Sequence, residues 1–136
     1  MPTTGYSGTP LLKKLGLKPE LKVRLIHPPD NYFQLLETDI SAQVCRPGET
    51  PGWVHLFADS RKVFEKEMLR LKPVAARNPQ IVIWVSWYKK SSGIATDLTE
   101  DDIRGWALSN DLVDVKVCAV SEQWSGLKLV VPLSKR

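Results

Sequence analysis

The residues with the greatest capacity for chemistry follow the apolar segment I-V-I-W-V-S-W, which ends at Ser86 and Trp87. The polar run after it supplies four more candidate ligand-binding residues: Lys89, Lys90, Ser91 and Gly93. Ammonium groups, hydroxyls and a glycine amide that can turn inward are suited to binding an anion, and an indole can stack on a planar ligand. The run lacks the phosphate-binding pattern G-x-x-x-x-G-K-[ST], so an ordinary solvent-exposed turn is the alternative.

His27 and Asp30 are a second pair of candidate ligand-binding residues. His27 is at the carboxyl end of a predicted strand, where a general base would be useful, and it could pair with Asp30 or Glu122 if the fold brings them together. Asp30 could reach a ligand in the same crevice, although its predicted position as a helix N-cap gives it a structural role.

The remaining titratable residues favour structural roles. His55 lies within a predicted strand, which indicates a hydrogen-bonded histidine in the core or at a sheet edge. Acidic side chains over 97–102 fall at the start of a predicted helix, where they favour the helix dipole. Cys45 and Cys118 lie in separate apolar runs without C-x-x-C spacing, which predicts reduced structural thiols. No set of residues has metal-ligand spacing, and we assign no catalytic residue, metal or cofactor.

Tryptophan is abundant, with five residues in a chain of 136. Trp87 and Trp124 fall at the ends of predicted strands, so they could share the rim of a crevice and stack a planar ligand or anchor a protein partner. The alternative is that the indoles complete the core of a small domain.

Alternating strands and helices must position these residues. Strands are predicted over 21–27, 53–58, 80–87, 114–120 and 127–132, helices over 11–15, 30–37, 61–74 and 99–110, and a possible edge strand over 42–46. The segment 122–126 is too short for a crossover, so the last strand should return antiparallel as a hairpin. The sequence therefore predicts a single α/β domain with a mostly parallel sheet over 20–136, preceded by an N-terminal segment, 1–19, that carries a short helix.

Local signals mark two helix starts. Thr9 before Pro10 predicts an N-cap followed by the first helical residue, and Thr99 with Asp102 three residues later predicts a capping box. The loop that begins at Lys89 therefore joins a strand to a helix. It should lie at the carboxyl end of the strands, where open α/β sheets bind ligands.

Composition limits the class of protein. With 43% hydrophobic and 25% charged residues, the chain is suited to one globular domain with a core of its own. It shows no apolar stretch of the signal-peptide kind and none that approaches the roughly 18 apolar residues of a membrane span. We therefore expect a soluble, cytoplasmic protein without a membrane partner.

The net charge of +4 is concentrated in one segment. Residues 61–77 contain six basic and two acidic side chains, and the rest of the chain is balanced. Lys62, Lys66 and Arg70 recur every four residues, opposite an apolar stripe, which is typical of the solvated face of a helix. A phosphate-contacting stripe is the alternative, but the chain has no RNA-recognition or zinc-finger signature, so a nucleic-acid partner is not expected.

Two resemblances extend this interpretation. The segments G-Y-S-G-T-P-L-L-K-K-L-G, W-V-S-W-Y-K-K-S-S-G-I-A-T-D-L-T-E and V-D-V-K-V-C-A-V-S-E-Q-W-S-G-L-K-L-V look like a bacterial family of small proteins catalogued only as a domain of unknown function. The elements predicted over 53–131 resemble, in their order, the second half of the S-adenosylmethionine-dependent methyltransferases. The resemblance implies a three-layer Rossmann-like fold with methyltransferase-like topology.

The residues that such a methyltransferase would need are missing. Those enzymes resemble one another in a glycine-rich turn after the first strand and in an acidic residue that ends the second strand. Here the turn is H-P-P-D over 27–30, whose prolines have no amide donors, and the segment around Cys45 ends in Arg46. We therefore expect a non-catalytic binding or interaction module for a small anionic ligand or a protein partner. The alternative is a diverged methyltransferase or another small enzyme that binds a phosphate-bearing ligand at the strand ends.

Overall fold

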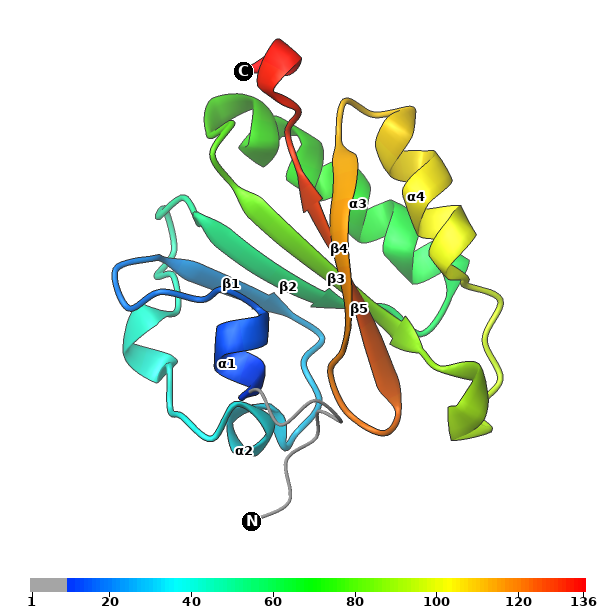
Figure 1. The fold of residues 1–136 in the computed structure, drawn as a ribbon. Helices are drawn as coiled ribbons and strands as arrows, with labels where there is room; N and C mark the ends of the chain where they lie inside the picture. The colour runs from blue at the N-terminus through cyan, green and yellow to red at the C-terminus, as the bar shows by residue number, and fades with distance from the viewer. Residues whose placement is uncertain (1–9) are drawn as a thin grey trace.

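A five-stranded mixed sheet organises the chain in the computed structural model, which describes residues 10–136 (Figure 1). The strand order is β1-β2-β3-β5-β4. The strands are β1 Val23–Ile26, β2 Trp53–Phe57, β3 Val82–Tyr88, β4 Val113–Ala119 and β5 Trp124–Val130. The α-helices are α1 Leu11–Lys14, α2 Tyr32–Leu36, α3 Arg61–Arg77 and α4 Glu100–Leu108. Three short 3-10 helices complete the described chain: η1 Ser41–Gln43, η2 Lys90–Ser92 and η3 Leu133–Lys135.

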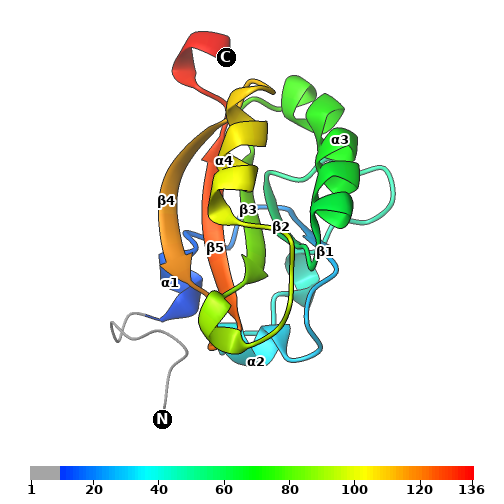
Figure 2. The same ribbon diagram turned by 90° about the vertical axis from the view of Figure 1, so that its right-hand side faces the viewer.

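Helices lie on both faces of the sheet. The pair α3 and α4 covers one face, and α1 lies against the other, with α2 near the lower edge (Figures 1 and 2). Because successive side chains of a strand point to opposite faces, β2 contributes Val54 and Leu56 to the core under α3 and Trp53 and Phe57 to the core under α1. We call these two clusters the α3 core and the α1 core.

The order of strands explains how the sheet ends. β1, β2 and β3 pair in parallel, whereas β5 is antiparallel to both of its neighbours, β3 and β4. The hairpin predicted for the last two strands is therefore confirmed. Its turn is tighter than predicted, because β5 begins at Trp124 and not at Leu127.

The apolar segment 42–46 does not form the edge strand that we considered. It contains the end of the 3-10 helix η1 and a single parallel bridge between Val44 and Val23. Cys45 donates its amide to the Val23 carbonyl at 2.8 Å, so this short piece borders β1 without extending the sheet.

The helix starts agree with the sequence in one case and differ in another. The capping box of α4 is confirmed: the Thr99 side chain accepts from the Asp102 amide, and the Asp102 carboxylate accepts from the Thr99 amide. Asp30 does not cap α2, because the N-cap position is Asn31 and its side chain makes no capping hydrogen bond. The predicted cap of the first helix, Thr9, lies outside the described residues.

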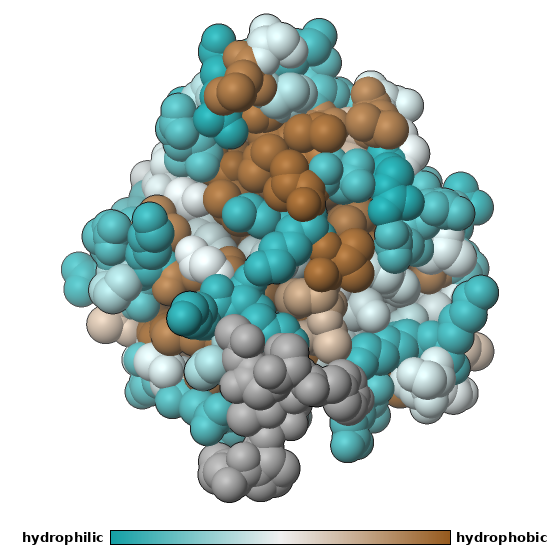
Figure 3. Space-filling view, in the orientation of Figure 1, coloured by the Kyte–Doolittle hydropathy of each residue, from teal (hydrophilic) through white to brown (hydrophobic). Residues whose placement is uncertain are grey.

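Helix α1 covers only part of its face of the sheet. Strand register places Val82, Val130 and Val113 side by side on the uncovered part, and each is partly exposed. Figure 3 shows hydrophobic surface in this region, above the grey residues. No helix within residues 10–136 is both long and apolar enough to cross a membrane.

Candidate ligand-binding crevice at the strand ends

A crevice of about 420 Å³ opens where the parallel strands end. We call it the strand-end crevice. The ends of β1, β2 and β3 each contribute a residue near it, and the hairpin turn closes its far side. Its lining residues are His27, Pro29, Phe57, Asp59, Val63, Tyr88, Gln123 and Trp124. This is the position at which open α/β sheets bind ligands.

Aromatic rings form one wall of the strand-end crevice. The rings of Tyr88 and Trp124 stack with centroids 4.0 Å apart, and Phe57 meets Trp124 edge-on at 5.0 Å. Trp124 has only 8% of its surface exposed, so it is held in one orientation by its neighbours. A rigid aromatic wall of this kind is suited to a planar ligand.

The turn after β1 brings a histidine to the mouth of the crevice. His27 has a left-handed backbone with φ of 56°, and its Nε2 lies 3.4 Å from Glu67 Oε2 on α3. The fold therefore pairs His27 with Glu67, and not with Asp30 or Glu122, the two partners considered from the sequence. Glu67 was missed, although it occupies a position in the apolar stripe of α3 between Phe64 and Leu71, where a carboxylate is out of pattern.

Asp30, the other candidate of this turn, is not brought to the crevice. Its side chain is exposed and is not part of the lining. The turn carries Pro28 and Pro29 in place of the glycines that would let a cofactor approach the backbone closely.

Below the crevice, a hydrogen-bonded chain of three side chains lies inside the α1 core. Tyr32 Oη is 2.7 Å from His55 Nδ1, and Ser86 Oγ is 2.7 Å from His55 Nε2. His55 and Ser86 are fully buried. Burial lowers the pKa of His55 to about 3 and raises the pKa of Tyr32, so the imidazole is neutral at physiological pH. A neutral ring donates from one nitrogen and accepts at the other, which satisfies both hydroxyls.

The hydrogen bond between His55 and Ser86 is the kind that activates a serine nucleophile, but Ser86 cannot act as one here. Ser86 Oγ has no exposed surface from which to attack a substrate. The role predicted for His55, a hydrogen-bonded core histidine, is confirmed, whereas Ser86 is not available to a ligand. Sequence reasoning missed Tyr32, which reaches His55 from α2.

The two indoles that were expected to share a rim lie on opposite faces of the sheet. Trp87 belongs to the α3 core and Trp124 to the α1 core. Trp124 pairs with Tyr88, the residue that follows Trp87 in β3, and successive residues of a strand point to opposite faces. The alternative, that these indoles complete the core, describes both residues better. Trp124 also borders the crevice.

The lysine loop lines a second, more open depression of about 950 Å³ beside the crevice, and Tyr88 is common to both. The depression is bordered by Trp87, Lys89, Lys90, Ser91 and Gly93, among others. Five of the predicted site residues therefore do lie together. We call this hollow the loop depression.

The loop itself is held by internal hydrogen bonds. Gly93 has φ of 75°, and its amide donates to the Lys90 carbonyl at 3.2 Å, so the prediction that this amide turns toward a ligand is wrong. Ser92 Oγ donates to the Lys89 carbonyl at 2.6 Å and accepts from the Ile94 amide at 3.1 Å. The side chains of Lys90 and Ser91 are exposed and remain able to contact a ligand.

Charges of both signs surround the loop depression. Glu100 and Asp101 line it together with the lysines, and Arg104 binds both carboxylates and Asp114. The acidic first turn of α4 therefore occupies the helix N-terminus, which would otherwise attract an anion. Within residues 10–136, no group of three or more His, Cys, Asp or Glu side chains could hold a metal ion.

Comparisons with known proteins leave the family open. No family model matches the chain. No curated protein matches it either. Among solved structures, the chain is similar to a protein in the NADB-Rossmann superfamily from Streptococcus agalactiae, with a TM-score of 0.44 and 10% identity. That match covers 96% of this chain and 64% of the other, so this chain spans less than two thirds of its length.

Proposed function

We propose that the protein is a non-catalytic binding module on a Rossmann-like scaffold of methyltransferase-like topology, with its ligand in the strand-end crevice. One observation carries the proposal. The aromatic wall of Tyr88 and Trp124 faces an open crevice, whereas the hydroxyl and imidazole of Ser86 and His55 are buried and satisfied by each other. The site therefore offers a surface for recognition, and the buried serine and histidine are kept away from a ligand.

The scaffold part of the proposal rests on strand order. The last strand, β5, is inserted antiparallel between β3 and β4, which is how the methyltransferase form of the Rossmann fold ends. In that arrangement the turn after the first strand approaches the cofactor. Here that turn carries Pro28 and Pro29, which supports binding without methyl transfer.

A planar ligand with an anionic group is the class that we favour. The stacked rings of Tyr88 and Trp124 provide a face for a planar group. Lys89 and Lys90 border the adjoining loop depression, where an ammonium group can contact an anionic substituent. The membrane and nucleic acids are not part of the proposal.

Thermal unfolding with a ligand panel tests this proposal. The panel contains S-adenosylmethionine, S-adenosylhomocysteine, nucleotides and phosphorylated metabolites. A ligand at about 100 times its dissociation constant should stabilise the fold by about 2.7 kcal/mol, which is a readily measured shift in Tm. Lys89→Ala with Lys90→Ala should abolish the shift for a phosphate-bearing ligand, and the matched pair Lys62→Ala with Lys66→Ala, on the exposed side of α3, should leave it unchanged.

An equal shift in both double variants would contradict the role of the lysine loop. No shift with any compound would contradict a small-molecule site, and co-purification would then test a protein partner in its place.

One observation favours the alternative of a small enzyme. His27, at the mouth of the crevice, is 3.4 Å from the nearly buried carboxylate of Glu67, an arrangement that can orient a general base. Conversion of S-adenosylmethionine to S-adenosylhomocysteine by the wild type, and its loss in His27→Gln, would establish that alternative. Our proposal predicts no conversion by either protein.

A further inference from the structure

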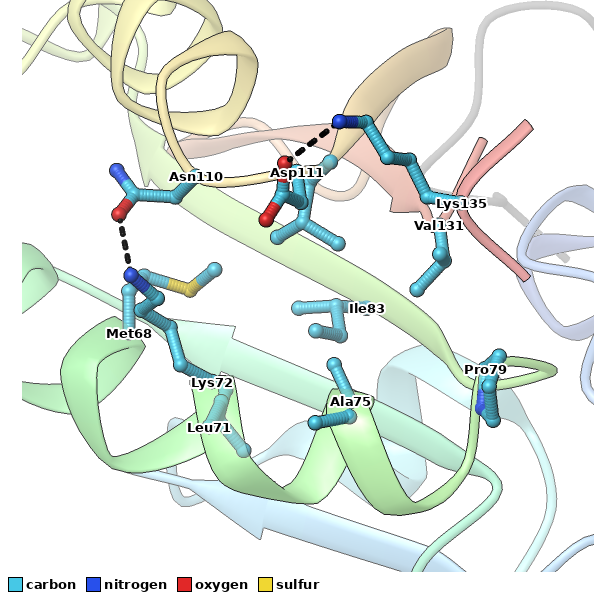
Figure 4. Close-up of a pocket in the computed structure, with 12 residues that line it drawn as sticks. Met68, Leu71, Lys72, Ala75, Pro79, Ile83, Asn110, Asp111, Val131 and Lys135 are labelled. Carbon is cyan, nitrogen blue, oxygen red and sulfur yellow. Dashed lines mark hydrogen bonds and ion pairs between the residues drawn. The ribbon is translucent and has the colours of Figure 1, made fainter. Parts of the chain in front are cut away.

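A third pocket lies at the opposite end of the sheet from the strand-end crevice. It has a volume of about 320 Å³ and lies between the C-terminal half of α3, the start of β3 and the segment after β5 (Figure 4). Its apolar lining comes from Met68, Leu71, Ala75, Ile83, Leu112 and Val131. The volume is at the lower end of the range of about 300–1,000 Å³ for small-molecule pockets. We call it the α3 pocket.

The rim of the α3 pocket carries two ammonium groups. Lys72 Nζ donates to Asn110 Oδ1 at 2.9 Å, and Lys135 Nζ lies 3.4 Å from Asp111 Oδ1 (Figure 4). Two lysines, one aspartate and one asparagine leave the rim with one net positive charge. An apolar interior under a positively charged rim is complementary to a molecule with an apolar body and an anionic end.

We propose that the α3 pocket binds a small amphipathic anion, an apolar chain that ends in a carboxylate. The acceptor that Lys72 now uses is a neutral amide, and a carboxylate oxygen forms a stronger, charge-assisted hydrogen bond with an ammonium group. The pair Lys135–Asp111 is 56% and 72% exposed at its two side chains, so it can rearrange at little cost. The chain of the ligand lies against Ala76, Pro79 and Val131, above the buried side chain of Ile83, and the head group lies between the two lysines.

This proposal goes beyond the function proposed above and does not depend on it. The α3 pocket and the strand-end crevice share no lining residue, and they lie at opposite ends of β3. A ligand in one can therefore be detected without a ligand in the other.

Methyl NMR with octanoate and 1-octanol as probes tests the proposal on the full chain. Octanoate should shift the methyl resonances of Met68, Ile83 and Val131 saturably. 1-Octanol, which has the same chain without the charge, should bind roughly ten- to a hundredfold more weakly, because it loses a charge-assisted hydrogen bond. Absence of saturable shifts in these methyls with octanoate would overturn the proposal, and equal affinity for the alcohol would overturn its anionic part.

Variants of the rim and wall separate charge from shape. Lys72→Met with Lys135→Met should weaken octanoate binding at least about tenfold, and Lys66→Met, an exposed lysine of the same helix outside the pocket, should leave it unchanged. Ala76→Leu adds bulk at an exposed lining position and should abolish binding while the spectrum stays that of a folded protein. Unchanged binding in either test variant would contradict the proposed site.

Asp111→Asn should strengthen octanoate binding, whereas the other test variants weaken it. Asparagine tolerates the left-handed backbone of this position, φ 62°, and its amide cannot compete with a ligand carboxylate for Lys135. Octanoate should therefore bind up to about fivefold more tightly, since an exposed ion pair contributes up to about 1 kcal/mol. Weaker octanoate binding in Asp111→Asn would overturn the placement of the ligand carboxylate beside Lys135.

Discussion

The two cores of this protein are built by different means, although both rest on the same strands. The α3 core is assembled mostly from aliphatic side chains such as Ile83 and Val85, and two well-formed helices cover it (Figure 2). The α1 core contains aromatic rings and polar side chains, and the buried polar atoms of these side chains have hydrogen-bond partners. Among the described residues, no buried side-chain nitrogen or oxygen lacks a partner.

The difference follows from the helices that cover each face. Helix α1 has four residues, too few to supply a long apolar stripe, but its C-terminal carbonyl is placed over the sheet. The carbonyl of Leu15 accepts from the indole nitrogens of both Trp53 and Trp84, at 3.3 and 2.9 Å. Tyr32 reaches down from α2 to His55 in the same way. Residue types that suggest catalysis are here used to attach short helices to the sheet.

The largest expected effect comes from removing the centre of this network. His55→Ala should lower the free energy of unfolding by about 3–5 kcal/mol, because it leaves a cavity and two buried hydroxyls without partners. Urea unfolding followed by circular dichroism measures the loss.

A triple variant separates polarity from shape. Tyr32→Phe, His55→Leu and Ser86→Ala together remove all three polar groups, so the triple variant should recover part of the stability lost in His55→Ala. A triple variant less stable than His55→Ala would contradict the account of this core.

Acid should weaken the α1 core selectively. The unfolded chain takes up a proton on His55 near its ordinary pKa of 6.5, whereas the folded protein does so only near pH 3. The stability that comes from the neutral ring is complete above pH 6.5 and is lost as the pH falls toward 3. Between pH 7.5 and 4.5 this loss should be roughly 3 kcal/mol.

Unfolding measured at both pH values in the wild type and in the triple variant isolates this contribution. The variant lacks His55 and should lose less stability to acid than the wild type. An equal loss in both proteins would show that His55 is already protonated in the folded state or exposed to solvent.

A pair of glycines gives a smaller contrast between the two faces. A Cβ added at Gly126 would lie 3.1 Å from Val120 Cγ2 and 3.2 Å from Trp84 Cε3, so Gly126→Ala should cost about 1–3 kcal/mol. Gly105, in α4, has open space around the same position, and Gly105→Ala should stabilise the protein by about 0.5–1 kcal/mol through helix propensity. Thermal unfolding of the two variants measures both changes, and a gain at Gly126 would contradict the tight packing of the α1 core.

Much of the fold could be predicted from local patterns. The capping box at Thr99 and the short segment between the last two strands each require only a few neighbouring residues, and both were interpreted correctly. The structure of the segment around Cys45 was harder to predict, because a segment with a single bridge to β1 has the same apolar pattern as a short strand.

The candidate site was predicted less completely because its contacts join distant parts of the chain. His55 is 23 residues from Tyr32 and 31 residues from Ser86 in the sequence, and no local spacing predicts either contact. Likewise His27 and Glu67 are 40 positions apart. The sequence located the end of the sheet where the crevice lies, but which side chains face it depends on the strand register.

The most direct test of the central claim is a titration followed by the indole N–H resonances in ¹H–¹⁵N spectra. The probes are S-adenosylhomocysteine and ATP. We predict a saturable shift of Trp124, which borders the strand-end crevice, with no change at Trp53 and Trp84, whose N–H groups are bound to the Leu15 carbonyl. A Trp124 resonance that stays fixed with both probes, or changes that begin at Trp53 and Trp84, would contradict a ligand site in this crevice.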